Sequence, residues 1–177
     1  MSPMVRQPMT IEHALLGFLR EKPLHGYEIH RRMGDPEGLG LVWQVKQSQL
    51  YALLGKLEES GYVSGELESQ GSRPPRKIYS LTEAGSRTFL EWVGSPVEHG
   101  REMRLNFMVK LYFARMEGEE TVHRLVKAQR EMCVRWLDLV EVSSGKEPGS
   151  FRNLIEEFRA GQIEAMLAWL DGYGSAQ

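Results

Sequence analysis

The chain has 177 residues, of which 41% are hydrophobic and 26% are charged, a composition that supports one or two small domains with buried cores and excludes wholesale disorder. With 22 Lys and Arg against 24 Asp and Glu, the net charge is −2, which excludes a polycation that coats nucleic acid through bulk charge. The longest stretch without a charged residue is 47–55, nine residues, whereas a membrane-spanning helix needs about 20 apolar residues. We therefore expect no membrane partner.

The cysteine count and the charge distribution indicate the compartment of the protein and the kind of DNA-binding surface it can have. Cys133 is the only cysteine, so no disulfide can form within the chain, and the first eight residues lack the apolar core of a secretory signal. These two features predict a cytoplasmic protein. Residues 1–93 carry 11 basic and 11 acidic residues, which leaves 22 − 11 = 11 basic and 24 − 11 = 13 acidic residues for 94–177. A DNA-binding surface must therefore come from the arrangement of charges, because neither half has an excess of basic residues.

Apolar periodicity predicts three helices in the first third of the chain. Residues 10–19 repeat apolar side chains at helical spacing, and this helix is expected to end near Pro23. A second, short helix is expected over residues 26–33. The third carries a leucine stripe over 50–57 and is expected to end at Gly61, which has the position of a C-terminal cap.

The pattern changes after this third helix. Residues 62–69 and 77–81 alternate apolar and polar side chains, which predicts two strands of a hairpin. Between them, residues 70–76 are polar and basic, and two adjacent prolines stiffen the expected loop. Thr82 is a suitable N-cap for a fourth helix, which is expected to end at the Gly-Ser-Pro sequence 94–96.

The C-terminal half is expected to contain helices only. Residues 105–116 and 122–140 keep helical apolar spacing, and a last helix is expected from about residue 150, after the loop 143–149. One of these helices is about 24 residues long, roughly 36 Å, and such long apolar stripes need a covering partner. We interpret this half as a dimerisation module. The alternative is a bundle that packs on its own N-terminal domain.

Three helices followed by a hairpin form the order of a winged helix-turn-helix, in which the third helix enters the DNA major groove and the wing touches the backbone or minor groove. The predicted fold class is therefore mainly α with a small β-hairpin wing. Five motifs make the prediction more specific: 14–19 (ALLGFL), 23–29 (PLHGYEI), 50–51 (LY), 57–63 (LEESGYV) and 74–85 (PPRKIYSLTEAG).

This set of motifs closely resembles the PadR family of winged-helix transcriptional regulators, and the resemblance covers residues 11–92. The C-terminal half, with the sequence LNFMVKLYF at 105–113, is similar to the helical domain of virulence-activator-type members. We therefore expect a winged helix-turn-helix domain over 1–93 and a helical dimerisation domain over 101–177. The resemblance implies a repressor that binds a pseudo-palindromic DNA operator as a homodimer and that a small aromatic effector releases, without a cofactor.

Ten residues are candidates for DNA contact: His25, Lys46, Gln47, Ser48, Gln49, Tyr51, Lys56, Arg73, Arg76 and Lys77. The lysines and arginines suit phosphate binding, the glutamines can read base edges, and Tyr51 resembles a family tyrosine that approaches a phosphate. Each also has a plainer explanation: solvated basic or amide side chains, a Tyr51 ring packed beside Leu54, and a His25 that merely caps its turn. Where the family commonly has Ser-Pro-Gly-Thr, residues 46–49 read Lys-Gln-Ser-Gln, so the operator sequence is expected to differ.

Trp92, Trp136 and Trp169 are candidates for an effector pocket, because flat aromatic side chains together with methionines suit an aromatic ligand. Aromatic residues on amphipathic helices more often belong to a core. The sequence indicates no metal site, since the histidines and Cys133 lack the spacing of metal ligands.

Enzyme classes find no support in the sequence. It lacks a Gly-x-Ser-x-Gly elbow and a Walker A loop, and residues 38–43 begin like a dinucleotide fingerprint but lack its third glycine. Two other interpretations remain: a small-molecule-binding or protein-interaction module without strong operator binding, and a MarR-like regulator. The latter normally has dimerisation helices on both sides of the winged domain, whereas about nine residues precede the first helix here.

Overall fold

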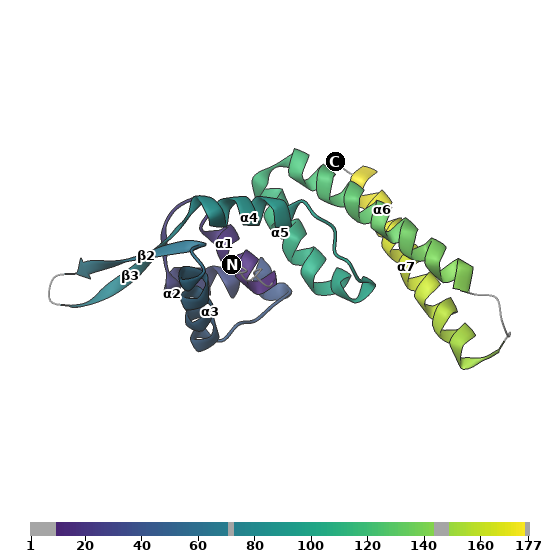
Figure 1. Cartoon of the computed structure of the whole chain (residues 1–177), viewed down its shortest axis with the longest axis horizontal. Coiled ribbons are helices and arrows are strands. Elements are labelled where there is room, and N and C mark those ends of the chain that lie inside the picture. Colours follow the sequence, from purple (N-terminus) through teal and green to yellow (C-terminus); the bar gives the residue numbers. More distant parts are fainter. Residues whose placement is uncertain (1–9, 71–72, 144–148, 176–177) are drawn as a thin grey trace, which may run out of the picture.

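The computed structural model describes residues 10–70, 73–143 and 149–175 of the chain (Figure 1). It is mainly helical with one three-stranded antiparallel sheet, which confirms the predicted fold class. In chain order the elements are α1 (Thr10–Phe18), β1 (Leu24–His25), α2 (Gly26–Met33), η1 (Leu39–Leu41), α3 (Gln47–Glu59), β2 (Val63–Gln70), β3 (Arg73–Leu81), α4 (Glu83–Val93), η2 (Gly100–Glu102), the π-helical turn η3 (Met103–Phe107), α5 (Met108–Glu117), α6 (Glu119–Ser143) and α7 (Phe151–Ser175).

The sheet contains a strand that the sequence did not predict. β1 has only two residues, too few for a periodic pattern, and it pairs Leu24 with Tyr79 and His25 with Ile78 on β3. Because the chain must leave its helix in time to enter this strand, α1 ends at Phe18, five residues before the expected end at Pro23. The strand order is β1-β3-β2, which places β1 beside the wing hairpin.

The predicted loop over 70–76 is wrong, because β2 extends to Gln70 and β3 begins at Arg73. The ladder pairs Glu68 with Arg76 and Gln70 with Arg73, with an irregularity between Glu68 and Gln70. Pro74 and Pro75 fit into the first part of β3 because β1 pairs with β3 only at Ile78 and Tyr79. The edge of β3 that faces away from β2 therefore needs no backbone N–H donor at the two prolines. Residues 71 and 72 lie outside the described residues. In Figure 1 the hairpin projects from the helical body as a long wing.

Two helix boundaries follow local chemistry. α3 begins at Gln47, after an N-cap residue, Lys46, whose side chain makes no capping hydrogen bond. It ends before Gly61, whose φ of +76° favours glycine, as the sequence predicted. Thr82 caps α4: its Oγ accepts a hydrogen bond from the Gly85 backbone N–H at 3.1 Å, which confirms the predicted start.

The apolar stripe over 105–116 was expected to need a partner chain, and this expectation is wrong. Phe107, Val109 and Phe113 are buried within the single chain, because α5 packs against α1 and α4. The Phe113 ring meets the rings of Phe18 and Phe89 edge-on, at centroid distances of 5.2 Å and 5.7 Å. α5 therefore shares a core with the winged domain, as the alternative interpretation held for this part of the C-terminal half.

α6 and α7 lie side by side as a helical hairpin at the end of the molecule opposite the wing (Figure 1). Cys133 of α6 and Ile163 and Leu170 of α7 are buried along their contact. An ion pair joins Arg130 Nε to Asp171 Oδ1 at 2.6 Å. α7 also exposes three large apolar side chains near its start, Phe151, Leu154 and Phe158.

Candidate functional site

A groove opens where the wing meets the helices of the N-terminal domain. We call it the wing groove, and its volume is about 500 Å³. Its lining comes from the start of α2, from α3 and from β3: His25, Gly26, Tyr27, Tyr51, Pro75, Arg76 and Lys77. A Cβ atom on Gly26 would lie 2.5 Å from the Tyr51 Cε1 atom, so glycine is needed here to let the Tyr51 ring cover the start of α2. Since the N-terminus of a helix attracts anions, this wall of the groove suits a phosphate.

Aromatic and cationic side chains alternate along the wing groove. The Arg76 guanidinium lies 5.3 Å from the centroid of the Tyr27 ring, and the His25 ring stacks on the same tyrosine at 5.6 Å. Both Tyr27 and Tyr51 expose about two fifths of their surface, 43% and 41%. Arg76 is therefore held in place by an aromatic face while it stays accessible, an arrangement that suits contact with a phosphate.

Lys77 differs from Arg76, because it already has an acidic partner. Its Nζ lies 2.6 Å from Glu58 Oε2 of α3 and 5.6 Å from the Tyr79 ring centroid. The hydrogen bond to Glu58 raises the pKa of Lys77 above its usual value. This pair ties the wing to α3, and a DNA phosphate would have to compete with Glu58 for the ammonium group.

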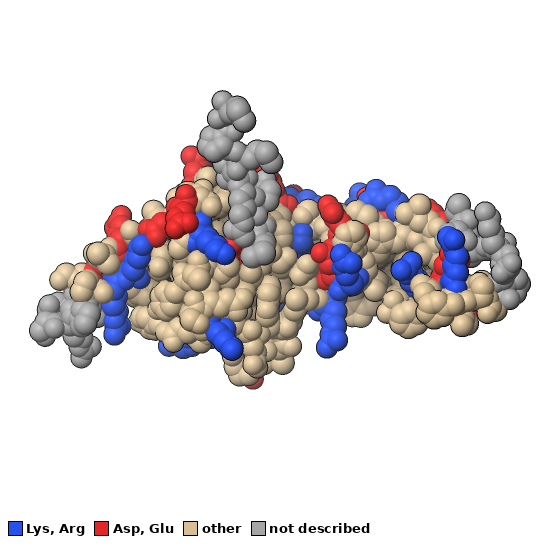
Figure 2. All heavy atoms as spheres, turned by 60° about the horizontal axis from the view of Figure 1, so that its bottom comes forward, with Lys and Arg blue, Asp and Glu red and all other residues tan. Residues whose placement is uncertain are grey.

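The start of α3 is open to solvent. Lys46, Gln47, Ser48 and Gln49 are all exposed, and so is Lys56, about two helical turns further along α3. The Arg73 side chain lies outside the described part of the structure. On the face seen in Figure 2, lysine and arginine side chains form small separate groups rather than one continuous patch. This agrees with the neutral charge balance of the N-terminal half.

His25 has a fixed position at the edge of the wing groove. Its Nδ1 lies 3.2 Å from the Lys77 carbonyl oxygen, and its Nε2 lies 3.2 Å from Glu68 Oε2. Its backbone N–H donates to Glu28 Oε2 at 2.9 Å. Sequence reasoning missed Tyr27, Glu58 and Glu68 as parts of this site, since their contacts span strands and helices far apart in the chain. Tyr27 could have been found, because it lies within the motif PLHGYEI.

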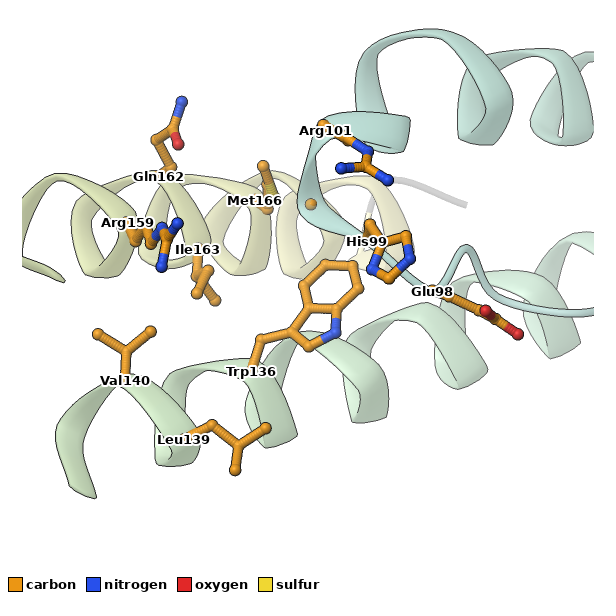
Figure 3. Close-up of a pocket in the computed structure, with 11 residues that line it drawn as sticks. Glu98, His99, Arg101, Trp136, Leu139, Val140, Arg159, Gln162, Ile163 and Met166 are labelled. Atoms are coloured by element: carbon orange, nitrogen blue, oxygen red, sulfur yellow. The ribbon is translucent and has the colours of Figure 1, made fainter. Parts of the chain in front are cut away.

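A second hollow lies between α6, α7 and the segment that leads into η2 (Figure 3). We call it the hairpin cavity, and its volume is about 500 Å³. Its lining combines an indole, apolar side chains and cations: Glu98, His99, Gly100, Arg101, Trp136, Leu139, Val140, Arg159, Gln162, Ile163 and Met166. Figure 3 shows the Trp136 ring and the Ile163 side chain pointing into the space between the two helices, with His99 beside the indole.

The structure does not bring the three predicted effector tryptophans together, because only Trp136 lines the hairpin cavity. The Trp92 ring stacks on the His13 ring at 4.8 Å. The Trp169 ring meets the Phe107 ring at 6.2 Å and stacks on the Tyr173 ring at 5.3 Å. Trp92 and Trp169 therefore pack against neighbouring rings within the chain, the plainer explanation that the sequence left open.

A buried cation lies where α5 packs against the end of α4. Lys110 of α5 donates hydrogen bonds from Nζ to the Trp92 carbonyl oxygen at 2.8 Å and to the Ser95 carbonyl oxygen at 2.9 Å. Its Nζ also lies 2.8 Å from Ser95 Oγ. Burial lowers the pKa of Lys110 to about 8, against the opposing influence of Glu102 and Glu98. These bonds fix the segment that links α4 to the hairpin cavity.

Two further observations concern the described residues alone. They contain no group of three or more histidine, cysteine, aspartate or glutamate side chains placed to hold a metal ion. None of the helices that the structure describes is long and apolar enough to cross a bilayer.

Residues 15–91, which include both walls of the wing groove, match the model of the Transcriptional regulator PadR-like family. Residues 15–91 belong to the PadR-like family. Two curated relatives are transcriptional regulators, in agreement with the prediction that the chain is not an enzyme. The Negative transcriptional regulator PadR of Bacillus subtilis is 31% identical over 120 residues, which cover 68% of this chain and 65% of that protein. The Probable transcriptional regulator Rv1176c of Mycobacterium tuberculosis is 29% identical over 96 residues, covering 54% of this chain and 50% of that protein. The matched part thus spans less than two thirds of either relative.

Solved structures of PadR-like proteins also resemble this chain. The crystal structure of Bacillus subtilis PadR in complex with operator DNA has a TM-score of 0.49 and 25% identity, and the match covers 96% of this chain and 99% of that one. The same protein in complex with p-coumaric acid gives a TM-score of 0.41 at 24% identity, with 93% of each chain covered. A PadR family regulator from Eggerthella lenta is 32% identical at a TM-score of 0.40, over 46% of this chain and 67% of that one.

Proposed function

We propose that this PadR-like protein is a sequence-specific DNA-binding regulator that acts as a homodimer and represses transcription by occluding a promoter. The observation that carries the proposal is the exposed start of α3 beside the wing groove. There, two exposed glutamines lie on the helix that such domains place in the major groove, while Arg76 offers a positioned cation on the wing. The curated name of the Bacillus relative, a negative regulator, supports repression rather than activation.

The proposal divides the DNA contacts between two elements. Gln47 and Gln49 read base edges, since the glutamine amide can both donate to and accept from adenine. Arg76 and the start of α2 bind phosphates, which positions the protein without reading sequence. Tyr51, which follows Gln49 on α3, lines the wing groove.

The homodimer is supported by the exposed face of α7. Phe151, Leu154 and Phe158 follow one another at spacings of three and four residues, so they lie on one side of the helix, and 77%, 55% and 66% of their surfaces are exposed. Three large apolar side chains in one stripe are typical of a protein interface. We assign this stripe to a second copy of the chain, because a two-fold operator requires two winged domains at a fixed spacing.

The hairpin cavity supports an effector of the aromatic carboxylate class. Trp136 offers a flat face for an aromatic ring, and Arg101 and Arg159 offer guanidinium groups for a carboxylate. Since α7 also carries the proposed dimer contact, a ligand here would change the spacing of the two winged domains and release the operator.

Fluorescence anisotropy with labelled DNA tests the proposal. The wild-type protein is titrated against the region upstream of its own gene and against a shuffled duplex of equal length and composition. We expect binding to the upstream region at least 1,000-fold tighter than to the shuffled duplex, on the order of the specificity of such regulators. Equal, weak binding to both duplexes would contradict the proposal and favour a small-molecule-binding or protein-interaction module instead.

A further inference from the structure

The ion pair between Lys77 and Glu58 joins the wing to α3. Lys77 lies on β3, Glu58 lies in the last turn of α3, and the ammonium Nζ donates a hydrogen bond to Glu58 Oε2 at 2.6 Å. Both side chains are partly buried, since 36% of Lys77 and 31% of Glu58 are exposed. Water and salt therefore screen this pair less than they would screen a pair on the open surface.

The pair depends on a glycine in the neighbouring strand. Gly65 of β2 lies opposite Tyr79 in the hairpin register, and Tyr79 is two residues along β3 from Lys77. A Cβ atom on Gly65 would lie 2.7 Å from Glu58 Oε1 and would collide with the Lys77 Cε atom. The absence of a side chain at residue 65 thus leaves the room in which the ammonium meets the carboxylate.

The position of Glu58 is unfavourable for α3 taken alone. A carboxylate in the last turn of a helix is disfavoured by the helix dipole, which is negative at that end. Lys77 offsets this cost with a cation from the wing. The same hydrogen bond raises the pKa of Lys77 above its usual value. The ammonium is therefore charged at neutral pH, and its charge is compensated within the chain.

Lys77 lines the wing groove together with Arg76, but the two cations differ in what they contact. Arg76 lies over the ring of Tyr27, whereas Lys77 already holds a carboxylate. A cation adds to the affinity for DNA when it neutralises a phosphate and releases the counterions of that phosphate. Lys77 can do so only by leaving Glu58, which would place an uncompensated carboxylate beside the DNA backbone. This exchange replaces one anionic partner by another and brings no net gain.

We propose that Glu58 withholds Lys77 from DNA phosphates and thereby limits the sequence-independent affinity of the protein. This inference rests on the proposed DNA-binding function. Lys77 then braces the wing against α3, and Glu58 acts on DNA binding through Lys77 without touching DNA itself. The sequence suggested that both adjacent cations, Arg76 and Lys77, contact phosphates. In this proposal only Arg76 makes that contact.

The affinity of the variant Glu58→Gln for the shuffled duplex, measured over a salt series, tests the proposal. Glutamine keeps the shape of the side chain and loses its charge, so the Lys77 ammonium becomes free to reach a phosphate. We expect tighter binding than for the wild type, with a slope of log K against log salt concentration that is steeper by about 0.9 for each protomer. For a dimer, the gain in affinity should shrink by about tenfold between about 50 mM and about 200 mM salt.

Three further variants separate the pairing from the net charge. Glu59→Gln removes the same charge from the next, exposed position of α3 and should keep the wild-type salt slope. Gly65→Ala removes no charge but pushes the two paired side chains apart, so its slope should steepen as that of Glu58→Gln does. Glu58→Gln combined with Lys77→Met lacks the released ammonium and should return to the wild-type slope.

Acetylation of lysines in the free protein, followed by mass spectrometry, adds a readout without DNA. An amine reacts only when it is unprotonated, and the bond to Glu58 raises the pKa of Lys77. We therefore expect Lys77 to react severalfold faster in Glu58→Gln than in the wild type, while the exposed Lys127 on α6 reacts equally in both. Equal rates for Lys77 in the two proteins would overturn the proposal.

The two proposals fail in different ways. If the wild type binds neither duplex at about 50 mM salt, the lower end of the range in which phosphate contacts weaken steeply, the proposed function has failed and the withholding fails with it. Specific operator binding together with a Glu58→Gln or Gly65→Ala variant that keeps the wild-type salt slope would overturn only the withholding. A Glu59→Gln variant that steepens equally, or a double variant that stays steep, would also overturn it, because the effect would then not depend on Lys77.

Discussion

Lys110 of α5 holds the carboxyl end of α4, because its Nζ donates a hydrogen bond to the Trp92 carbonyl oxygen at 2.8 Å. The same ammonium lies 5.0 Å from the centroid of the Trp92 ring, and only 5% of the lysine is exposed. A cation at a helix C-terminus is favoured by the helix dipole, and here it belongs to the next helix in the chain. The contact fixes the angle at which the C-terminal helices leave the winged domain.

The first prediction concerns stability at alkaline pH. Burial lowers the pKa of Lys110 in the folded protein to about 8 from an unfolded value of 10.5, so the folded state binds its proton less tightly. The stability that follows from this difference is therefore fully present above the unfolded pKa of 10.5, and it is lost as the pH falls through the folded pKa of about 8. The difference in the free energy of unfolding is about 3 kcal/mol.

Urea denaturation followed by circular dichroism, between about pH 8 and about pH 10.5, checks this prediction. The wild type should gain about 3 kcal/mol over this range relative to Lys110→Met, in which the titrating group is absent. Lys127→Met removes an exposed lysine on α6 and should follow the wild type. Parallel curves for the wild type and Lys110→Met would show that Lys110 titrates as in the unfolded chain.

The second prediction concerns the homodimer. Replacing Phe158 by Glu places a charge in the exposed apolar stripe of α7, and we expect it to separate the proposed dimer into monomers of 20.3 kDa at micromolar concentration. Light scattering coupled to gel filtration measures the mass. Leu67→Glu, at an exposed position on the wing, changes apolar surface at the other end of the molecule and should leave the dimer intact. A wild-type protein that is a folded monomer would contradict the assignment.

The third prediction concerns the effector. An aromatic carboxylic acid, the effector class proposed above, should quench the fluorescence of Trp136 and lower the affinity for the operator. Replacing Arg159, which lines the hairpin cavity, by Ala should weaken ligand binding by about 1–3 kcal/mol through loss of a charged hydrogen bond. Trp92→Phe should leave ligand affinity unchanged, because Trp92 packs against His13 instead of lining the cavity. A Trp136→Phe variant that is quenched as strongly as the wild type would place the ligand elsewhere.

Much of the fold could be predicted because long helices and their caps depend on residues that are close together in the sequence. The leucine stripe of α3, the Thr82 cap of α4 and the long stripes of α6 and α7 all depend on neighbours within four residues. The predicted start of β3, residue 77, is four residues too late. Two adjacent prolines are typical of a loop, and the sequence alone does not show that this segment pairs with β2.

The site was less predictable than the fold, because its contacts join distant residues. The pairs Lys77–Glu58 and His25–Glu68 depend on strand register and on the approach of α3 to the wing, neither of which a periodic pattern contains. The three tryptophans show the same limit: each lies on a helix as expected, yet only tertiary packing decides that Trp136 lines a cavity and that Trp92 stacks on His13.

The last prediction compares two substitutions in the proposed DNA-binding surface. Gln49→Ala should cost about 1–3 kcal/mol on the operator and little on shuffled DNA, because it removes base contact and leaves phosphate contacts in place. Arg76→Ala should instead weaken binding to both duplexes alike. It should also flatten the slope of log K against log salt concentration by about one unit for each altered protomer.

The affinity of Gln49→Ala and Arg76→Ala for operator and shuffled DNA, measured over a salt series, tests the central claim most directly. The account predicts that the first variant loses specificity with an unchanged salt slope and that the second keeps specificity with a flatter slope. If both variants lose specific and nonspecific binding equally, or if neither changes either quantity, α3 does not read the operator and the wing does not bind its backbone.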